Sequence, residues 1–179
     1  MKLDFDGEKY KQASSQQKAW GKSLISELDL RGPERILDLG CGNGALTAEI
    51  AALVPDGSVL GIDASESMIK TAQADHGAAN LCFELQNIDS IDFESQFDVV
   101  VSNAALHWVK DHRKLLANVL QCLKERAVAR FQFAGDGNCS NLIAVLREVM
   151  AEEDYAGYFE RFEWPWYMPA VEQYRALID

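Results

Sequence analysis

The stretch Ile36-Leu37-Asp38-Leu39-Gly40-Cys41-Gly42-Asn43-Gly44 decides the fold of this chain. Its apolar first half ends in closely spaced glycines, and a helical pattern over residues 44–53 follows at once. A strand that enters a helix through Gly-x-Gly brings backbone N–H groups and the positive end of the helix up to a ligand, because glycine has no side chain in the way. The stretch therefore predicts a strand, a ligand-binding glycine loop and a helix.

The same alternation repeats along the chain. Four more strands are predicted at residues 58–62, 81–85, 97–101 and 127–133, and two more helices at 65–75 and 115–123. Strands that alternate with helices pair in parallel and are joined by right-handed crossovers. The predicted fold is therefore α/β, with a doubly wound, mainly parallel sheet that carries helices on both faces.

Bulk composition excludes several functional classes. A net charge of -11 over 179 residues opposes binding to a phosphate backbone, so we expect no nucleic-acid partner. No apolar run approaches the roughly 20 residues of a membrane span, and the N-terminus lacks the apolar stretch of a secretory signal, so we expect a cytoplasmic protein. The four cysteines and three histidines are widely scattered, and we assign no metal.

An acidic residue at the end of the second predicted strand completes the predicted ligand site at the glycine loop. Asp63 ends the second predicted strand about twenty residues after the loop, where a carboxylate accepts hydrogen bonds from both hydroxyls of a ribose. Loop and acid together predict an adenosine pocket. Gly40-x-Gly42-x-x-Ala45 also satisfies the dinucleotide-binding pattern, but Asp38 would repel a pyrophosphate and attract the cationic amino group of a methionine moiety. The charge balance therefore favours S-adenosylmethionine over a nicotinamide dinucleotide.

Three ordered motifs resemble those of the class I, seven-stranded, Rossmann-like methyltransferases that use S-adenosylmethionine, specifically the branch of trans-aconitate and juvenile hormone acid methyltransferases. Residues 36–44 resemble the first motif, residues 61–65 with Met68 the second, and residues 97–108 the motif of the fourth strand. The resemblance spans residues 34–108. It implies the Rossmann-like methyltransferase fold, with S-adenosyl-L-methionine as the cofactor.

The resemblance also implies where the cofactor binds. The glycine loop would line the methionine and ribose, Asp63 the ribose hydroxyls, and the residues after the second and third strands the adenine. Where the family usually has an acid for the adenine amino group, this chain has Asn87, whose amide oxygen accepts that hydrogen bond without the strength of a charge. The cofactor-binding residues predicted in this way are Asp38, Gly40, Gly42, Asn43, Gly44, Asp63, Ala64, Met68, Asn87, Ile88 and Asn103.

Two departures from the family pattern concern the end of the sheet. The usual Pro-Gly-Gly turn before strand five is replaced by Lys124-Glu125-Arg126-Ala127, which predicts a tighter or reshaped connection. The chain also stops near the point where the family's closing antiparallel strand pair begins. We therefore expect a truncated chain or an incomplete sheet that lacks this pair, with an exposed edge strand that favours association.

The segments that flank the sheet differ from it in pattern. Residues 8–29 carry apolar side chains at helical spacing, and Gly32-Pro33 ends that helix. Residues 141–150 are again helical, and an aromatic stretch broken by two prolines follows. Within one domain we distinguish an N-terminal helical flap (1–33), the cofactor-binding Rossmann-like core (34–140) and a helical and aromatic lid (141–179).

The predicted chemistry needs little from the protein beyond placement. Methyl transfer from a sulfonium requires an in-line approach of the acceptor, and holding both reactants in that geometry contributes roughly 7–11 kcal/mol. A carboxylate acceptor is already ionised at neutral pH, and a dry apolar pocket favours the cancellation of charge in the transition state. Ser102-Asn103-Ala104-Ala105 lacks the Pro-Pro-aromatic element of amino-methylating enzymes. We therefore expect transfer to a small-molecule oxygen acceptor such as a carboxylate.

Candidates for the acceptor pocket come from three parts of the chain. His107 follows the fourth strand, where it would orient or deprotonate an acceptor, although a packing histidine fits the position equally well. The tryptophans fit a pocket wall or an ordinary core, and the N-terminal helix fits a flap or plain amphipathic packing. The candidate residues are Tyr10, Gln17, Trp20, His107, Trp108, Trp164 and Trp166.

Two other functions share these features. A NAD-dependent oxidoreductase would use the same glycine loop and Asp63, and Asp38 argues against it. A non-catalytic S-adenosylmethionine-binding protein would keep the pocket without turnover, and Asn87 and the missing strands are consistent with it. The function that we predict is an S-adenosylmethionine-dependent methyltransferase with a small-molecule acceptor.

Overall fold

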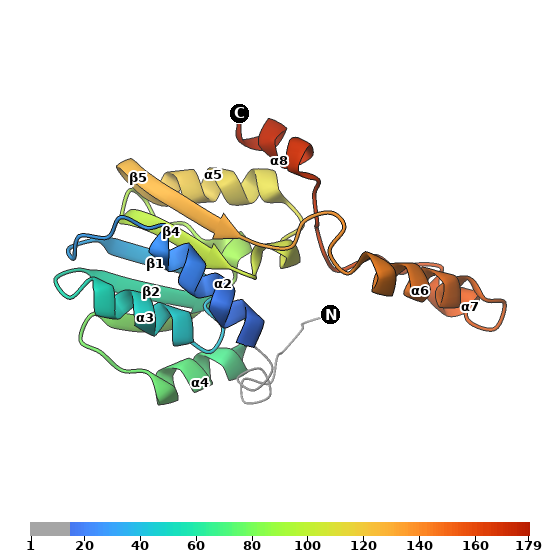
Figure 1. Ribbon diagram of the computed structural model, residues 1–179, viewed down its shortest axis with the longest axis horizontal. Coiled ribbons are helices and arrows are strands. Elements are labelled where there is room, and N and C mark those ends of the chain that lie inside the picture. Colours follow the sequence, from blue (N-terminus) through green and yellow to red (C-terminus); the bar gives the residue numbers. More distant parts are fainter. Residues whose placement is uncertain (1–14) are drawn as a thin grey trace.

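A parallel sheet forms the centre of the molecule. The computed structural model describes residues 15–179, with side chains described from Trp20 onward (Figure 1). Five strands, all parallel, lie in the order β3-β2-β1-β4-β5. They are β1 (Arg35–Leu39), β2 (Ser58–Asp63), β3 (Leu81–Leu85), β4 (Phe97–Asn103) and β5 (Leu123–Gln132). The order reverses between β1 and β4, and in such sheets ligands bind at the carboxyl ends of the strands beside that reversal.

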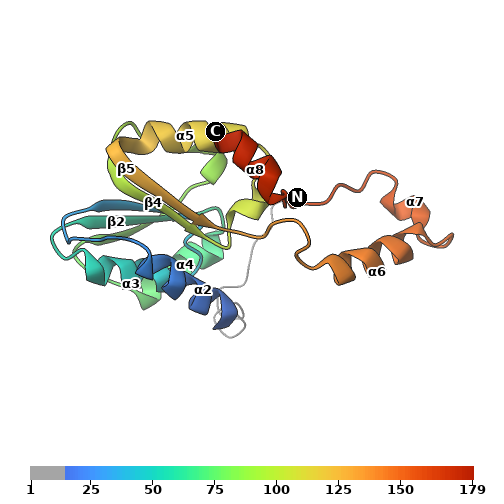
Figure 2. The ribbon, with the colours of Figure 1, turned by 45° about the horizontal axis from the view of Figure 1, so that its top comes forward.

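Helices cover both faces of the sheet, which confirms the predicted doubly wound α/β fold (Figures 1 and 2). One face carries α2 (Ser15–Ser26), α3 (Ala45–Leu53) and α4 (Glu66–Asp75), and the other carries α5 (His112–Cys122). Neighbouring residues of β1 point to opposite faces, since Ile36 is buried on the α2 and α3 side and Leu37 on the α5 side. Two short 3-10 turns, η1 (Ile88–Ser90) and η2 (Leu106–Trp108), follow β3 and β4.

The connection into β5 is reshaped, as the absence of a Pro-Gly-Gly turn predicts. α5 ends at Cys122 and β5 begins at Leu123, four residues before its predicted start at position 127. Leu123 pairs with Phe97 and Val128 pairs with Val99, so β5 advances by five residues where β4 advances by two. Arg126 lies in this surplus, with a left-handed φ of 64°. The junction is therefore a bulge in place of a glycine turn.

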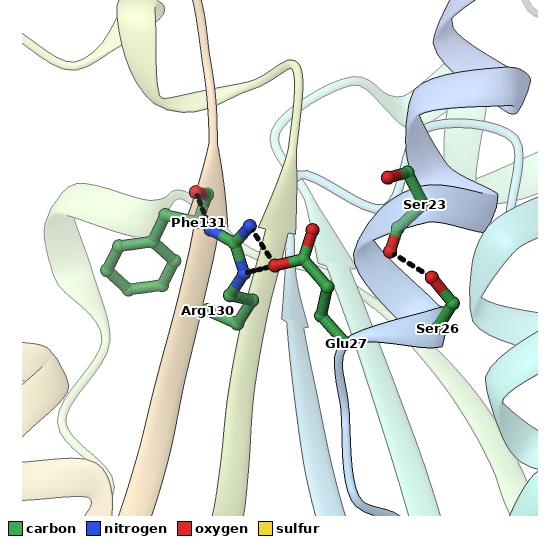
Figure 3. A network of polar contacts seen from close by, with 5 residues as sticks. All are labelled: Ser23, Ser26, Glu27, Arg130 and Phe131. Atoms are coloured by element: carbon green, nitrogen blue, oxygen red, sulfur yellow. Dashed lines mark hydrogen bonds and ion pairs between the residues drawn. The ribbon is translucent and has the colours of Figure 1, made fainter.

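β5 is an edge strand of the described sheet. β4 pairs with one side of it, and within residues 15–179 no strand pairs with the other, which agrees with the predicted incomplete sheet. Arg130 of β5 reaches toward α2 and donates from its Nε to the carboxylate of Glu27 at 2.9 Å (Figure 3). A second guanidinium nitrogen contacts the same carboxylate oxygen. This ion pair links the end of α2 to β5.

The C-terminal residues form an arm, a returning segment (residues 160–170) and a last helix. The arm consists of α6 (Ser140–Ala151) and α7 (Ala156–Phe159), which project away from the sheet and bury none of their residues (Figures 1 and 2). The chain then returns, and α8 (Val171–Ile178) lies beside α5. The lid function of residues 141–179 stays a prediction, as do the domain boundaries. None of the described helices is both long and apolar enough to span a membrane.

Candidate cofactor and acceptor site

The glycine loop after β1 is tightly packed at its glycine positions. Gly40, Gly42 and Gly44 have φ values of 74°, 55° and 77°, in the left-handed region that favours glycine. A Cβ on Gly40 would lie 2.3 Å from the Cβ of Ala105, and one on Gly44 would lie 2.6 Å from the ring of Phe83. The loop therefore needs glycine for its backbone turns and for its close approach to the segment after β4.

Asp63, at the carboxyl end of β2, braces this loop. Its Oδ2 accepts the backbone N–H of Gly42 at 2.9 Å, and its Oδ1 accepts the N–H of Ser65 at 2.8 Å. Each carboxylate oxygen has a further lone pair, so the side chain can still accept two ribose hydroxyls. Burial raises the pKa of Asp63, and the backbone hydrogen bonds lower it in part. The acid predicted to bind ribose therefore lies directly beside the loop.

Asp38 is buried at the end of β1, with 2% of its surface exposed. Its Oδ2 accepts the hydroxyl of Thr47, in the first turn of α3, at 2.7 Å. Burial raises the pKa of Asp38 to about 6, the Thr47 hydrogen bond opposes this rise, and the charge of Asp63 adds to it. Asn43, in the adjoining loop, is buried too. Two carboxyl groups thus interact across the loop, and a bound cation would favour their ionised forms.

The residues predicted to hold adenine follow β2 and β3. Met68 is buried on α4, and Ala64 is exposed just before that helix. Asn87 is exposed before η1, and its Oδ1 already accepts the N–H of Asp89 at 2.9 Å. An adenine amino group would therefore use the remaining lone pair of that oxygen. Ile88 is buried in the core on the α5 side of the sheet.

The flap helix α2 approaches the site near the end of β4. Asn103 is half-buried there, and a Cβ on Gly21 would lie 3.3 Å from its side-chain nitrogen. Trp20, the neighbour of that glycine, is 41% exposed. Tyr10 lies outside the described residues, and Gln17 belongs to α2 with a side chain outside them. The flap role of these residues stays a prediction.

A row of aromatic rings begins at η2 and continues into the returning segment. The ring centroids of His107 and Trp108 are 5.5 Å apart, and those of Trp108 and Trp166 are 5.8 Å apart. Trp166 stacks on Trp164 at 5.7 Å. The ammonium group of Lys110 donates to the backbone carbonyl of Trp164 and anchors the row. The fold thus brings together two pairs of acceptor-pocket candidates, at positions 107–108 and at 164 and 166, that are far apart in the sequence.

His107 offers an unused ring nitrogen beside this row. Its Nδ1 is buried and has no hydrogen-bond partner among the described residues. Burial lowers the pKa of His107, so the ring is neutral at neutral pH and keeps one acceptor nitrogen. The backbone carbonyl of His107 accepts the N–H of Tyr167 at 2.8 Å. The side chain thus has an unpaired ring nitrogen, while its backbone is held in place.

Three further residues near η2 had not been predicted as site residues. The ring of His112 lies 4.6 Å from that of Tyr167 and 5.3 Å from that of Tyr174. They come from α5, the returning segment and α8. No local pattern indicates such a cluster, because only the tertiary fold brings these segments together.

The chain belongs to a family of methyltransferases. A family model described as "Methyltransferase domain" matches residues 31–161, which include the whole sheet, the glycine loop and the arm. This match confirms the resemblance drawn from the three motifs. It also supports S-adenosylmethionine as the cofactor, since solved structures similar to this chain are S-adenosylmethionine-dependent methyltransferases.

Individual relatives place the chain more closely. It is 30% identical over 149 residues to a malonyl-[acyl-carrier protein] O-methyltransferase of Bacillus anthracis, covering 81% of this chain and 55% of that protein. It is 31% identical over 160 residues to a trans-aconitate 2-methyltransferase of Deinococcus radiodurans, covering 89% and 61%. A solved S-adenosylmethionine-dependent methyltransferase from Mesorhizobium loti matches with a TM-score of 0.57 and 31% identity, over 64% of this chain and 53% of that one. The chain spans between half and two thirds of these proteins.

Proposed function

We propose that the chain binds S-adenosylmethionine at the glycine loop and transfers its methyl group to an oxygen of a small-molecule acid. The observation that carries the proposal is the position of Asp63, whose two oxygens hold the N–H groups of Gly42 and Ser65. The carboxylate adjoins the glycine loop, in which a Cβ on Gly40 would collide with the Cβ of Ala105. Ribose-binding oxygens beside a bare backbone suit an adenosine that carries a methionine tail.

Different residues contact different parts of the cofactor. Residues 40–44 line the methionine moiety, Asp63 accepts the ribose hydroxyls, Met68 contacts the adenine face and Asn87 accepts the adenine amino group. When bound, S-adenosylmethionine supplies an electrophilic methyl group on a sulfonium. Asp38 and Asp63 provide negative charge at the loop, which favours a cationic ligand and disfavours the pyrophosphate of a nicotinamide dinucleotide.

The aromatic row supports an apolar pocket for the acceptor. Trp108, Trp164 and Trp166 form a wall that continues from His107. Exclusion of water by such a wall favours a reaction in which a carboxylate and a sulfonium lose their charges. His107 orients the acceptor by donating from Nδ1–H, in the tautomer that protonates this nitrogen, because a carboxylate oxygen only accepts and needs no base. The names of the malonyl-[acyl-carrier protein] and trans-aconitate enzymes support an acid as the acceptor class.

Calorimetry and a transfer assay test the two halves of the proposal. Titration with S-adenosylmethionine should show binding, and methyl-labelled cofactor should transfer label to members of a panel of carboxylic acids. An Asp63→Asn variant should bind about 10- to 100-fold more weakly, because a hydrogen bond to a charged group contributes roughly 1.5–3 kcal/mol. Asp56→Asn, at an exposed acid in the turn before β2, is the matched control and should bind normally.

The same experiments distinguish the alternative functions. Binding of a nicotinamide dinucleotide in place of S-adenosylmethionine would show an oxidoreductase. Cofactor binding without transfer to any acceptor would show a non-catalytic binding protein. Transfer to amines alone would reject an acid as the acceptor.

Three further assignments stay predictions from the sequence. They are the cytoplasmic location, the absence of a nucleic-acid partner and the absence of a catalytic metal. Within the part of the chain that the structure describes, no three His, Cys, Asp or Glu side chains are grouped so that they could hold a metal ion. A metal analysis of the purified protein tests the last assignment, since a stoichiometric metal ion would contradict it.

A further inference from the structure

A buried imidazole connects several segments around η2, the turn that carries His107 and Trp108. His112, the first residue of α5, is almost fully buried. Its Nε2 lies 3.0 Å from the backbone oxygen of Leu106 in η2, and its Nδ1 lies 3.1 Å from the hydroxyl of Tyr174 in α8. The rings of Tyr167 and Phe133 pack on it at 4.6 Å and 5.3 Å. Both polar atoms of the ring are therefore used between elements.

The two hydrogen bonds determine the tautomer of His112. A backbone carbonyl only accepts, so Nε2 carries the proton and donates it to Leu106. Nδ1 then accepts the O–H of Tyr174. Burial lowers the pKa of His112, which agrees with a neutral ring. The imidazole is thus a bridge that runs from α8 to η2.

The turn held by this bridge carries the candidate acceptor residues. Leu106 immediately precedes His107 and Trp108 in η2. The His107 carbonyl also accepts the N–H of Tyr167, whose ring packs on His112. An apolar residue at position 112 would fill the same space, but it would remove one of the two donors to the Leu106 carbonyl, the other being the N–H of Val109 at 2.9 Å. The imidazole therefore fixes the geometry of η2 as well as filling space.

We propose that His112 is a positioning residue for methyl transfer, which holds η2, and with it His107 and Trp108, in the orientation that the acceptor requires. The hydrogen bond from Tyr174 to His112 also holds α8 against α5, although Tyr174 lies 62 residues further along the chain. This inference rests on the proposed function of the acceptor side. The bridge does not contact the glycine loop itself, and only Ala105, the residue before η2, packs against Gly40, so cofactor affinity should change much less than turnover.

A Tyr174→Phe variant tests the bridge with the loss of one hydroxyl. Its ring can keep the contacts with His112 and Phe133. We expect the affinity for S-adenosylhomocysteine to stay within about twofold of wild type, and kcat/KM for the acid acceptor to fall about five- to tenfold, because one orienting hydrogen bond is lost. Tyr158→Phe is the matched control, since that side chain is 85% exposed on the arm, and it should behave as wild type.

Two substitutions of His112 separate positioning from packing. His112→Gln keeps a side-chain N–H that can reach the Leu106 carbonyl, whereas His112→Leu keeps only the bulk. We expect the glutamine variant to retain more of the acceptor kcat/KM than the leucine variant. Nitrogen NMR of the wild-type imidazole gives a readout independent of turnover, and should place the proton on Nε2. If the leucine variant does not fold, the Tyr174→Phe kinetics and the NMR measurement still test whether His112 positions η2.

Three results would overturn the inference: wild-type kinetics in Tyr174→Phe, a loss of S-adenosylhomocysteine affinity as large as the loss of turnover, or a proton on Nδ1 of His112. A wild-type protein that transfers methyl to no acid would reject the proposed function and this inference with it. An active wild-type protein whose Tyr174→Phe variant is equally active would reject the inference alone.

Discussion

We expect ligand binding to depend on pH through Asp38. Its pKa in the ligand-free protein is raised from 3.8 to about 6, chiefly by burial. Its protonated form therefore stabilises the fold fully below pH 3.8, and this contribution is lost as the pH rises through about 6. A cationic ligand has the opposite preference, because it pairs with the ionised acid. We expect the affinity for S-adenosylmethionine to rise between about pH 5 and about pH 7 and then to level off.

Calorimetric titration across that range measures the effect. An Asp38→Asn variant keeps an oxygen that can accept the Thr47 hydroxyl, but it cannot ionise. It should bind S-adenosylmethionine more weakly at high pH, and its affinity should change less with pH. The change that remains would come from Asp63, whose pKa is also raised. A wild-type affinity that does not change between about pH 5 and about pH 7 would argue that neither acid senses the ligand's charge.

Gly40 limits what the loop tolerates. A Gly40→Ala variant would place its Cβ 2.3 Å from the Cβ of Ala105 while keeping a φ of 74°. We expect unfolding in urea to show a loss of about 2–4 kcal/mol, from the left-handed backbone and the overpacking together. Gly77→Ala is the control, because no atom lies within 4 Å of its added Cβ. Equal stability of the two variants would contradict the close packing of the loop.

Short motifs indicate the residues of the predicted cofactor side more clearly than those of the predicted acceptor side. Gly40 and Asp63 are recognisable because each sits at a fixed place relative to a strand end. Thr47, the partner of Asp38, is harder to recognise, because its only signal is its place in the first turn of the helix after the loop. His112 had none, since its partner Tyr174 comes from a helix that no local pattern places beside α5.

α2, the helix of the predicted flap, is held by the burial of Leu24 more than by the Arg130–Glu27 ion pair. Leu24 is fully buried, whereas the side chains of Arg130 and Glu27 are 38% and 49% exposed. Exposed ion pairs contribute roughly 0–1 kcal/mol, and truncating a buried leucine costs roughly 2–5 kcal/mol. We therefore expect Leu24→Ala to destabilise the protein by about 2–5 kcal/mol and Arg130→Gln by less than about 1 kcal/mol.

Chemical denaturation of the two variants, at low and at high salt, checks this ranking. The small effect of Arg130→Gln should shrink further as salt screens the wild-type pair, while that of Leu24→Ala should persist. If the arginine variant were the less stable of the two, the link between α2 and β5 shown in Figure 3 would be the main anchor of the flap.

Strands and helices were predicted where hydrophobic periodicity is uninterrupted. β3 matches its prediction over Leu81–Leu85, and α3 differs by one residue at its start. β5 begins four residues before its predicted start, because the polar residues Lys124, Glu125 and Arg126 form a bulge that continues from α5 without a loop. Polar sequence inside a bulge carries no strand pattern, so periodicity could not reveal it.

The arrangement of the sheet followed from the alternation of strands and helices, but the arm did not. Parallel pairing and helices on both faces were predicted from the order of the elements. The apolar residues of α6 predicted a helix, yet the helix buries none of its residues and projects from the core (Figure 1). An amphipathic pattern predicts that a helix has an apolar face, and it does not specify what that face packs against.

The open edge of β5 gives a last prediction about the molecule as a whole. A strand with unpaired backbone groups can pair with a second chain, and Val128 adds an apolar side chain that is 53% exposed. We expect this 179-residue chain to associate as its concentration rises. A lysine on an edge strand opposes such pairing, so Val128→Lys should shift the sedimentation profile toward monomer, while the neutral Val128→Thr should not. Concentration-independent monomers of the wild-type chain would show that the edge is protected within the protein itself.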